Sequence, residues 1–224
     1  LGVASEIYDK TISLKPDFAE AHHELSITLR KQGEMGKAFS ASIKALRLKQ
    51  NFTEAYVNLS QILKSVTFKS LDPRLYPIFT NLLTIENHVR PEGLARAFST
   101  FLKQDLLVKD LIDELKFFDS PEDLNNSIAS LRQLKLLHHL MRICPLPDLE
   151  MEELFVNIRR CLLFNLGKIK ASDDVIYFLS TLCLHCFINE YVYFESEEEA
   201  ELIDELEKII TESFVQSKQP ELLN

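Results

Sequence analysis

Apolar residues recur three and four positions apart along most of the chain, and this spacing predicts helices. Leu25 and Leu29 form one such pair, and Leu202, Leu206 and Ile209 continue the pattern near the end. Residues at these spacings share one face of an α-helix, whereas a half-buried strand needs strict alternation. The run 191–194, Tyr-Val-Tyr-Phe, is the only β-prone stretch, and we interpret it as the packed end of a helix. The pattern therefore predicts an all-α protein.

An eight-residue segment occurs twice near the start of the chain. Residues 15–22 read Lys-Pro-Asp-Phe-Ala-Glu-Ala-His, and residues 49–56, which begin 34 positions later, read Lys-Gln-Asn-Phe-Thr-Glu-Ala-Tyr. Self-similarity at a fixed period between 20 and 50 residues is typical of repeat architectures. We therefore expect the first part of the chain to consist of repeated helical units.

Small and large residues between the two copies follow the order expected of two antiparallel helices. Leu25 and Leu29 are placed to fill the space between the helices, and Ala38 and Ala45 leave room for the second helix to press against the first. Gly33 falls where the first helix must end, at a position that favours a positive φ. The period and this residue order resemble the tetratricopeptide repeat (TPR) family. The resemblance implies a TPR-type solenoid of helical hairpins.

The resemblance covers one complete repeat and two partial ones. In this register residue 1 falls in the middle of a repeat, so we expect the sequence to be part of a longer array. A third repeat begins at residues 54–63, but Thr67 occupies the position of the turn glycine and Pro73 interrupts the expected second helix. We therefore predict TPR repeats in residues 1–68 and an irregular α-helical domain, stacked on the solenoid, in residues 69–224.

Helix-start signals punctuate the second domain. Proline is tolerated in a first helical turn, Ser and Asp cap free backbone N–H groups, and early carboxylates oppose the positive end of the helix dipole. Such signals occur at residues 72–73, 90–92, 120–123, 148–150, 172–174 and 196–199. In the last, Ser196 and Glu199 have the spacing of a capping box. We interpret the acidic run 195–201 as stabilisation of this helix start, and an acidic docking strip is the alternative.

Composition and charge exclude several classes of protein. The chain of 224 residues has 5 Gly and 8 Pro, too few for the glycine-rich phosphate loop of a nucleotide-binding enzyme or the turns of an all-β sandwich. Its net charge of −9, without a basic stripe, disfavours nucleic acid and anionic membranes as partners. The longest apolar stretch, 175–187, is too short to span a bilayer, and no signal peptide is visible. We expect a cytoplasmic protein.

Cysteine and histidine residues offer candidate metal or redox chemistry. Cys183 and Cys186 flank His185, with Cys161 upstream, but the pair lies in an apolar helical segment, so we predict core packing rather than metal or redox use. The adjacent pair His138 and His139 points in directions about 100° apart on a helix and cannot chelate one ion together. No nucleophile elbow or zinc-protease motif occurs. The sequence therefore predicts no metal, no cofactor and no catalytic residue.

The segment 186–193, followed by the acidic run 197–199, resembles the helical connector of bacterial proteins in which a TPR array precedes an S-adenosylmethionine-dependent methyltransferase domain. The resemblance implies a catalytic domain outside this chain, since no strand with a glycine-rich turn occurs here. TPR arrays also precede glycosyltransferases. This gives the alternative function, an accessory region that positions substrate for a larger enzyme.

The TPR resemblance places the first helix of each hairpin on the concave face, where polar and mixed residues mark contact with a partner. Asn58 matches the position of an asparagine ladder that holds a peptide backbone, but Glu24 occupies it one repeat earlier. We therefore predict a non-catalytic module that binds a peptide or protein partner on this face. The predicted partner-binding residues are Glu20, His23, Ile27, Arg30, Lys31, Glu54, Val57, Asn58, Gln61 and Lys64, of which Arg30, Lys31 and Lys64 form a basic edge.

Overall fold

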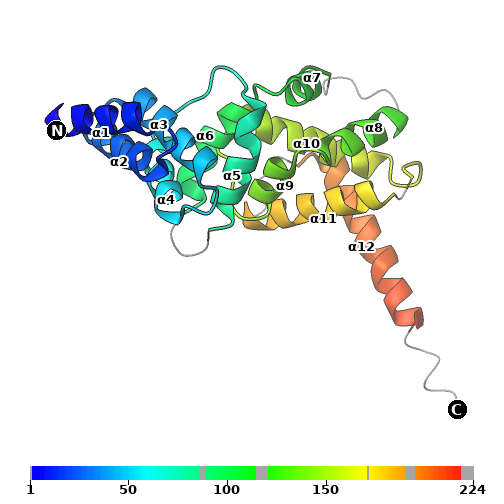
Figure 1. The fold of residues 1–224 in the computed structure, drawn as a ribbon. Coiled ribbons are helices and arrows are strands. Elements are labelled where there is room, and N and C mark those ends of the chain that lie inside the picture. Colours follow the sequence, from blue (N-terminus) through cyan, green and yellow to red (C-terminus); the bar gives the residue numbers. More distant parts are fainter. Residues whose placement is uncertain (1, 86–88, 115–120, 171, 190–194, 218–224) are drawn as a thin grey trace, which may run out of the picture.

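The computed structural model describes residues 2–85, 89–114, 121–170, 172–189 and 195–217. Within these ranges the regular structure is helical and contains no strand, which confirms the all-α prediction (Figure 1). The run 191–194 lies outside the described residues. The helices are α1 (Gly2–Leu14), α2 (Ala19–Lys31), α3 (Met35–Leu48), α4 (Thr53–Leu63), the 3-10 helix η1 (Pro73–Leu75), α5 (Tyr76–Leu83), α6 (Glu92–Leu102), α7 (Leu106–Glu114), α8 (Pro121–Leu131), α9 (Lys135–Met141), α10 (Leu149–Phe164), α11 (Asp173–Ile188) and α12 (Glu197–Ser217).

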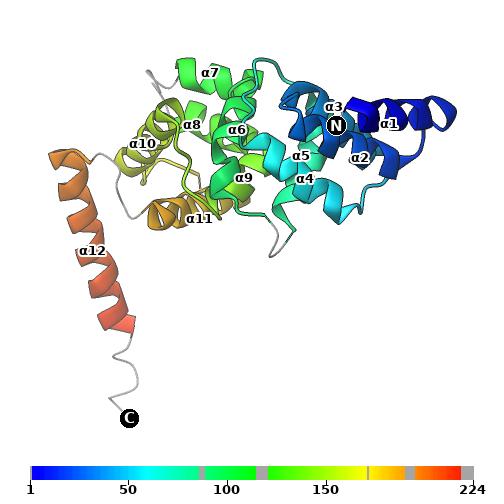
Figure 2. The same cartoon turned by 90° about the vertical axis from the view of Figure 1, so that its left-hand side faces the viewer.

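Helices α1 to α4 pack one after another and form one end of the molecule (Figures 1 and 2). The turn between α2 and α3 depends on Gly33, whose φ is 82°, as the sequence predicts. The backbone N–H of Gly33 donates to the carbonyl of Arg30 (3.0 Å), and that of Glu34 donates to the carbonyl of Leu29 (3.0 Å). This pair of bonds is a Schellman motif, which satisfies the last carbonyls of α2 and reverses the chain into α3.

Small residues let α3 approach its neighbours closely. Ala38 and Ala45 are both 0% exposed, in agreement with their predicted packing role. The Ser26 hydroxyl on α2 donates to the carbonyl of Ala38 (2.7 Å), and the Ser42 hydroxyl on α3 donates to the carbonyl of Ala55 on α4 (3.4 Å). Each contact needs two helix backbones within reach of one short side chain, so a larger residue at these positions would force the helices apart.

The helix pattern changes after α4, but the apolar core does not break there. Residues 64–72 form no helix, and Phe68 turns inward, where its ring meets Phe39 on α3 (5.7 Å), Phe79 on α5 (5.6 Å) and Phe101 on α6 (5.2 Å). One buried cluster extends from Ala19 to Leu182. The run of helices is therefore interrupted over residues 64–72, while both parts of the chain share a core.

The predicted helix starts in the second part coincide with observed ones. Asp72 caps η1, Asp148 caps α10 and Ser172 caps α11 by accepting bonds from backbone N–H groups of the first turn. Pro121 is the first residue of α8, and α6 begins directly after Pro91. Local capping chemistry thus sets where these helices begin.

Helix α12 begins against α10, and its C-terminal part extends away from the body of the molecule (Figures 1 and 2). The capping box is present: the Ser196 backbone N–H donates to the Glu199 carboxylate (2.9 Å), and the Glu199 N–H donates to the Ser196 hydroxyl (3.3 Å). Glu199 is fully buried and accepts bonds from Arg159 (3.0 Å) and Arg160 (3.2 Å) of α10. Burial opposes ionisation, but the bonds from Ser196 and Arg159 hold the pKa of Glu199 below its ordinary value. This carboxylate therefore anchors α12 to α10.

The close approach of α3 to its neighbours can be tested by overpacking it. Replacing Ala38 or Ala45 with Leu should lower the free energy of unfolding by about 1–3 kcal/mol, because neither site has room for three more carbons. Lys44→Leu, at an exposed position of the same helix, is the matched control and should change stability little. Urea unfolding of the three variants measures this. Equal and small losses in all three would show that α3 does not pack as described.

Candidate functional site

A groove of about 510 Å³ lies between α2 and α4. Near the start of α2, the ring of His23 contacts Phe52, which directly precedes α4. Further along α2, Ser26 and Arg30 form hydrogen bonds with Asn58, which lies in the middle of α4. The two helices therefore run in the same direction. The groove is lined by His23, Ile27, Arg30, Thr53, Glu54, Val57, Asn58 and Gln61. Seven of the ten predicted partner-binding residues are among them, and Thr53 is the one lining residue that the prediction missed.

The other three predicted residues lie outside this lining. Glu20 is exposed and accepts a bond from Nζ of Lys49 (2.8 Å), the residue that directly follows α3. Lys31 and Lys64 are exposed where α2 and α4 end, and Lys64 Nζ donates to Gln61 Oε1 (3.2 Å). These three residues therefore mark the two ends of the groove rather than its floor.

Asn58 is the centre of a hydrogen-bond network that joins three helices. Its side chain is only 5% exposed. Asn58 Nδ2 donates to Ser26 Oγ (2.8 Å), Ser26 Oγ donates to the carbonyl of Ala38 (2.7 Å), and Arg30 Nε donates to Asn58 Oδ1 (2.8 Å). The chain of bonds runs from α4 through α2 to α3. Buried polar groups that are fully paired in this way fix one arrangement of the helices around them.

The network changes the expected role of Asn58. An asparagine ladder holds a ligand with free amide groups, but both the oxygen and the nitrogen of Asn58 are engaged inside the protein. Arg30 is engaged too, through Nε, so it contributes less freely to a basic edge than the exposed Lys31 and Lys64. Asn58 and Arg30 thus support the wall of the groove.

His23 lies at the end of the groove near the start of α2 and is 8% exposed. Its ring contacts Phe52 at 4.8 Å between centroids, and its Nδ1 atom is buried without a hydrogen-bond partner in the described structure. Burial lowers the pKa of His23, and the carboxylates of Glu24, Glu54 and Glu20 oppose that shift without reversing it. A buried nitrogen without a partner costs free energy, which a ligand that bonds to it would recover.

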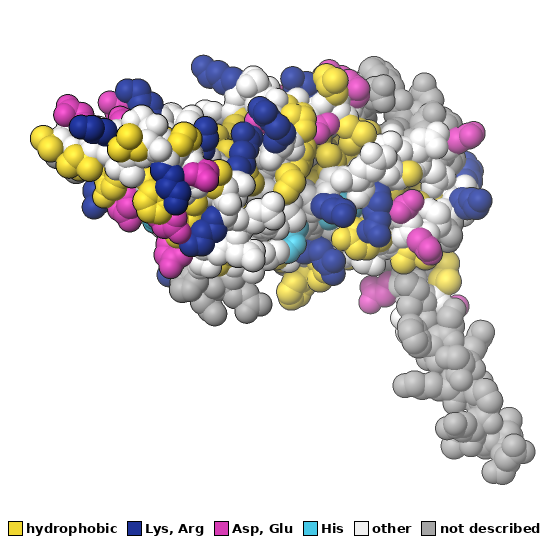
Figure 3. Space-filling model, in the orientation of Figure 1, with side chains coloured by type: hydrophobic (Ala, Val, Ile, Leu, Met, Phe, Trp, Pro, Cys, Tyr) yellow, Lys and Arg dark blue, Asp and Glu magenta, His cyan; other side chains and the backbone are white. Residues whose placement is uncertain are grey.

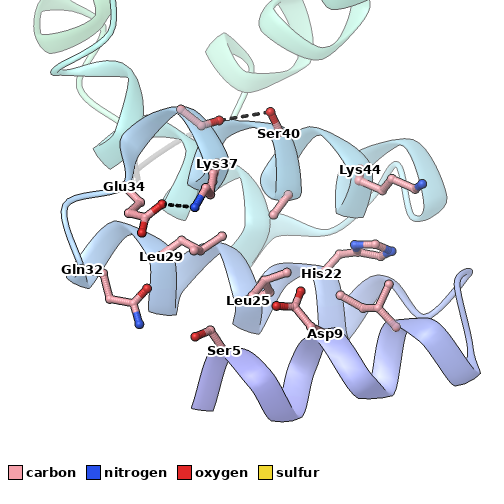
Figure 4. A pocket seen from close by; sticks show the side chains of 13 residues that line it. Ser5, Asp9, His22, Leu25, Leu29, Gln32, Glu34, Lys37, Ser40 and Lys44 are labelled. Atoms are coloured by element: carbon pink, nitrogen blue, oxygen red, sulfur yellow. Dashed lines mark hydrogen bonds and ion pairs between the residues drawn. The ribbon is translucent and has the colours of Figure 1, made fainter. Parts of the chain in front are cut away.

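A second and larger groove, about 620 Å³, lies on the other side of α2, between α1 and α3 (Figure 4). Ser5 and Asp9 approach from α1, Leu25 and Leu29 form the floor from α2, and Lys37 and Ser40 approach from α3. The sequence pattern did not predict this groove. The signal for it is the run of small residues Gly36, Ser40 and Ala41, which leaves the α3 wall open.

Polar groups of this second groove are largely paired within the chain. Glu34 and Lys37 form an ion pair, the Ser40 hydroxyl donates to the carbonyl of Gly36 (3.1 Å), and His22 Nε2 bonds to the carbonyl of Pro16 (2.9 Å). Among the described residues, one buried polar atom without a partner, His23 Nδ1, belongs to the lining of the groove between α2 and α4, and none belongs to the lining of the groove between α1 and α3.

The structure corrects the prediction that Cys183 packs in the core. Leu182 and His185 face inward from α11, and Cys183, one position after Leu182, lies about 100° away and is exposed. Cys186 is half-buried against the core, and burial raises the pKa of its thiol. His185 is buried, and its Nδ1 bonds to the carbonyl of Met141 (3.0 Å). Among the described residues, no group of His, Cys, Asp or Glu side chains is placed to hold a metal ion.

His138 is a core residue. It is buried, its Nε2 bonds to the carbonyl of Leu131 (3.1 Å), and its ring packs against Tyr177 and Phe178. His139, its neighbour, is half-buried. The described helices also include none that combines the length and the apolar character needed to cross a membrane.

Comparison with protein-family models gives no match for this chain, and comparison with curated proteins gives none either. The geometry of the two grooves and the chemistry of their walls therefore carry the functional argument.

The Asn58 network can be tested by a double-mutant cycle. Asn58→Ala should cost about 1–3 kcal/mol of unfolding free energy, because it leaves Ser26 and Arg30 without their partner. Ser26→Ala should be partly redundant with it, giving a coupling energy of roughly 0.5–3 kcal/mol, measured by urea unfolding of both single variants and the double variant. Asn126→Ala, at an exposed position of α8, is the control. Additive losses from Asn58→Ala and Ser26→Ala would contradict the network.

Proposed function

We propose that the chain is a non-catalytic protein-interaction module whose residues 1–68 form TPR-type hairpins, and that it binds a peptide or a segment of a partner protein in the groove between α2 and α4. One observation carries the proposal: half-exposed Ile27 and Val57 share this groove with the buried, unpartnered nitrogen of His23. Such a combination offers a partner both apolar contact and one specific polar contact.

The walls of the groove support this role because they are held rigidly. The network from Asn58 to Ser26 and Ala38 ties α4 and α2 to α3. A partner that binds a preformed surface loses less free energy to ordering than one that binds a mobile surface. The parallel packing of α2 and α4 also supports it, since the two helices lie side by side and line one surface together.

The buried Nδ1 atom of His23, which has no hydrogen-bond partner in the described structure, favours this groove over the larger one between α1 and α3. Glu34, Lys37 and Ser40 of the larger groove already bond within the chain. Charged side chains of both signs lie among apolar ones over the α1 to α4 end of the face drawn in Figure 3, so charge alone does not single out a site there. The distinguishing feature is the buried Nδ1 atom of His23, which has no hydrogen-bond partner in the described structure, in the same groove as Ile27 and Val57.

An accessory role beside a methyltransferase or glycosyltransferase domain stays a prediction from the resemblance of residues 186–193. Half of that segment, residues 190–193, lies outside the described residues. We therefore base the proposed function on the groove, which residues 1–68 form by themselves.

The proposal predicts which positions a bound peptide depends on. A displayed library of random 16-residue peptides, selected against the full chain, should yield binders whose affinity falls at least tenfold in Ile27→Asp or Val57→Asp variants. A charge in an apolar contact must be desolvated without a partner, and a tenfold loss corresponds to about 1.4 kcal/mol. Fluorescence anisotropy with labelled peptides measures the dissociation constants.

Two controls make the result specific. Ile7→Asp introduces the same charge at an exposed apolar position of α1, away from the groove, and should leave binding unchanged. Ser40→Asp changes the exposed wall of the groove between α1 and α3. Binders that are insensitive to Ile27→Asp but lost in Ser40→Asp would move the site to the other side of α2 and contradict the proposal.

A further inference from the structure

The groove between α2 and α4 has opposite charges at its two ends. Both helices carry acidic residues where they begin: Glu20 and Glu24 on α2 and Glu54 on α4. Both end in basic residues, with Arg30 and Lys31 on α2 and Lys64 after α4. Because α2 and α4 run in the same direction, like charges gather at each end. Lys49 pairs with Glu20, whereas the described structure gives Glu24, Glu54 and Lys31 no ion pair, so a partner can meet these charges.

Between its ends, the groove offers few hydrogen bonds to the backbone of an extended peptide, because its exposed polar residues Thr53, Glu54 and Gln61 lie in the first and last turns of α4. Asn58 Oδ1 and Nδ2 and Arg30 Nε are engaged in the network, and Ile27 and Val57 present only hydrocarbon. An extended segment would lay its backbone N–H and C=O groups against this surface without partners, at a cost in free energy. A helix satisfies those groups within itself and presents side chains alone. The walls therefore favour a helical occupant.

The direction of that helix follows from the charges. Helices favour acidic residues in the first turn and basic residues in the last, where they complement the helix dipole. A helix antiparallel to α2 and α4 would bring its acidic first turn to Lys31 and Lys64 and its basic last turn to Glu24 and Glu54. Its dipole would also oppose those of both neighbours. A parallel helix would bring like charges together at both ends.

Resting on the proposed function, we propose that the occupant of this groove is an amphipathic helix of a partner protein that lies antiparallel to α2 and α4, with an acidic first turn and a basic last turn. The apolar side chains of the partner helix recur three and four residues apart, and they cover Ile27 and Val57. Near its basic end it lies over His23. Since α2 has 13 residues, it is about 20 Å long, and a helix of similar length spans the groove.

Helix α12 of a second copy is a poor match for this site. It bears carboxylates in both halves, Glu198 in its first turn and Glu212 towards its other end, and has no basic residue in its last turn. In the antiparallel direction Glu212 would approach Glu24 and Glu54. The charge pattern of the groove thus points to a different protein.

A displayed library of 16-residue, helix-favouring peptides tests the inference. The apolar stripe is randomised, and the first and last turns are randomised among Glu, Gln, Lys and Ala. Selection against the full chain should enrich Glu in the first turn and Lys in the last. A benzophenone at the peptide N-terminus should cross-link near Lys31 and Lys64, and one at the C-terminus near Glu24 and Glu54, as located by mass spectrometry.

Charge reversal provides the matched comparison. Lys31→Glu combined with Lys64→Glu should weaken the selected peptides at least tenfold and reduce the salt dependence of binding. We choose these two rather than Arg30 because Arg30 belongs to the Asn58 network. Lys37→Glu combined with Lys44→Glu makes the same change in net charge on α3, in the other groove, and should leave affinity within about twofold. Circular dichroism of each double variant checks that it remains folded.

The possible outcomes separate this inference from the proposed function. One contrary result is that selected peptides fail to bind the Ile27→Asp variant and yet show no enrichment of Glu in the first turn and Lys in the last; another is that they cross-link in the opposite direction. Either result overturns the antiparallel helix and leaves the groove as a binding site. Peptides that bind equally well to Ile27→Asp overturn both. A library that yields no binder also overturns the inference, while extended peptides selected from the random library would still support the groove.

Discussion

The side chain of Asn58 holds together the three helices on which the candidate site depends. It lies on α4, reaches Ser26 on α2, and through that hydroxyl reaches the backbone of α3 at Ala38. Each group in this path is buried, so each bond must be satisfied or the packing must change. Arg30 Nε donates a hydrogen bond to Oδ1 of Asn58, and this bond holds the guanidinium against the wall of the groove. The groove is therefore a consequence of how the core is paired, and its shape is fixed before any partner arrives.

The same close packing extends beyond the hairpins and gives the groove a rigid base. Phe68 follows α4 and enters a ring cluster with Phe39, Phe79 and Phe101, so that α3 is also braced by helices of the second part of the chain. Residues 1–68 and the helices after them thus form one core, and a change in either part should be felt in the other. Helix α12 differs: Glu199 anchors its first turn to α10, and its C-terminal part extends away from the body (Figure 1).

Local features of the structure could be predicted from the sequence, and features that join distant residues could not. Gly33 was predictable because a positive φ at the end of a helix is a property of one turn, and the helix starts were predictable because caps act within three residues. The repeat period also brought seven of the ten predicted residues to one groove. The bonds of Asn58 to Ser26 and Arg30 join residues 32 and 28 positions apart, and no local pattern specifies them. The exposure of Cys183 depends on which face of α11 is covered, and that is decided by tertiary packing.

The central claim is that the surface between α2 and α4 receives the partner, and methyl NMR tests it most directly. In the full chain with labelled isoleucine and valine methyl groups, addition of a selected peptide should shift the resonances of Ile27 and Val57, which line that groove. The methyl of Ile12, in the groove between α1 and α3, should stay in place and acts as the internal reference for the opposite side of α2. A shift of Ile12 with Ile27 and Val57 unmoved would contradict the account.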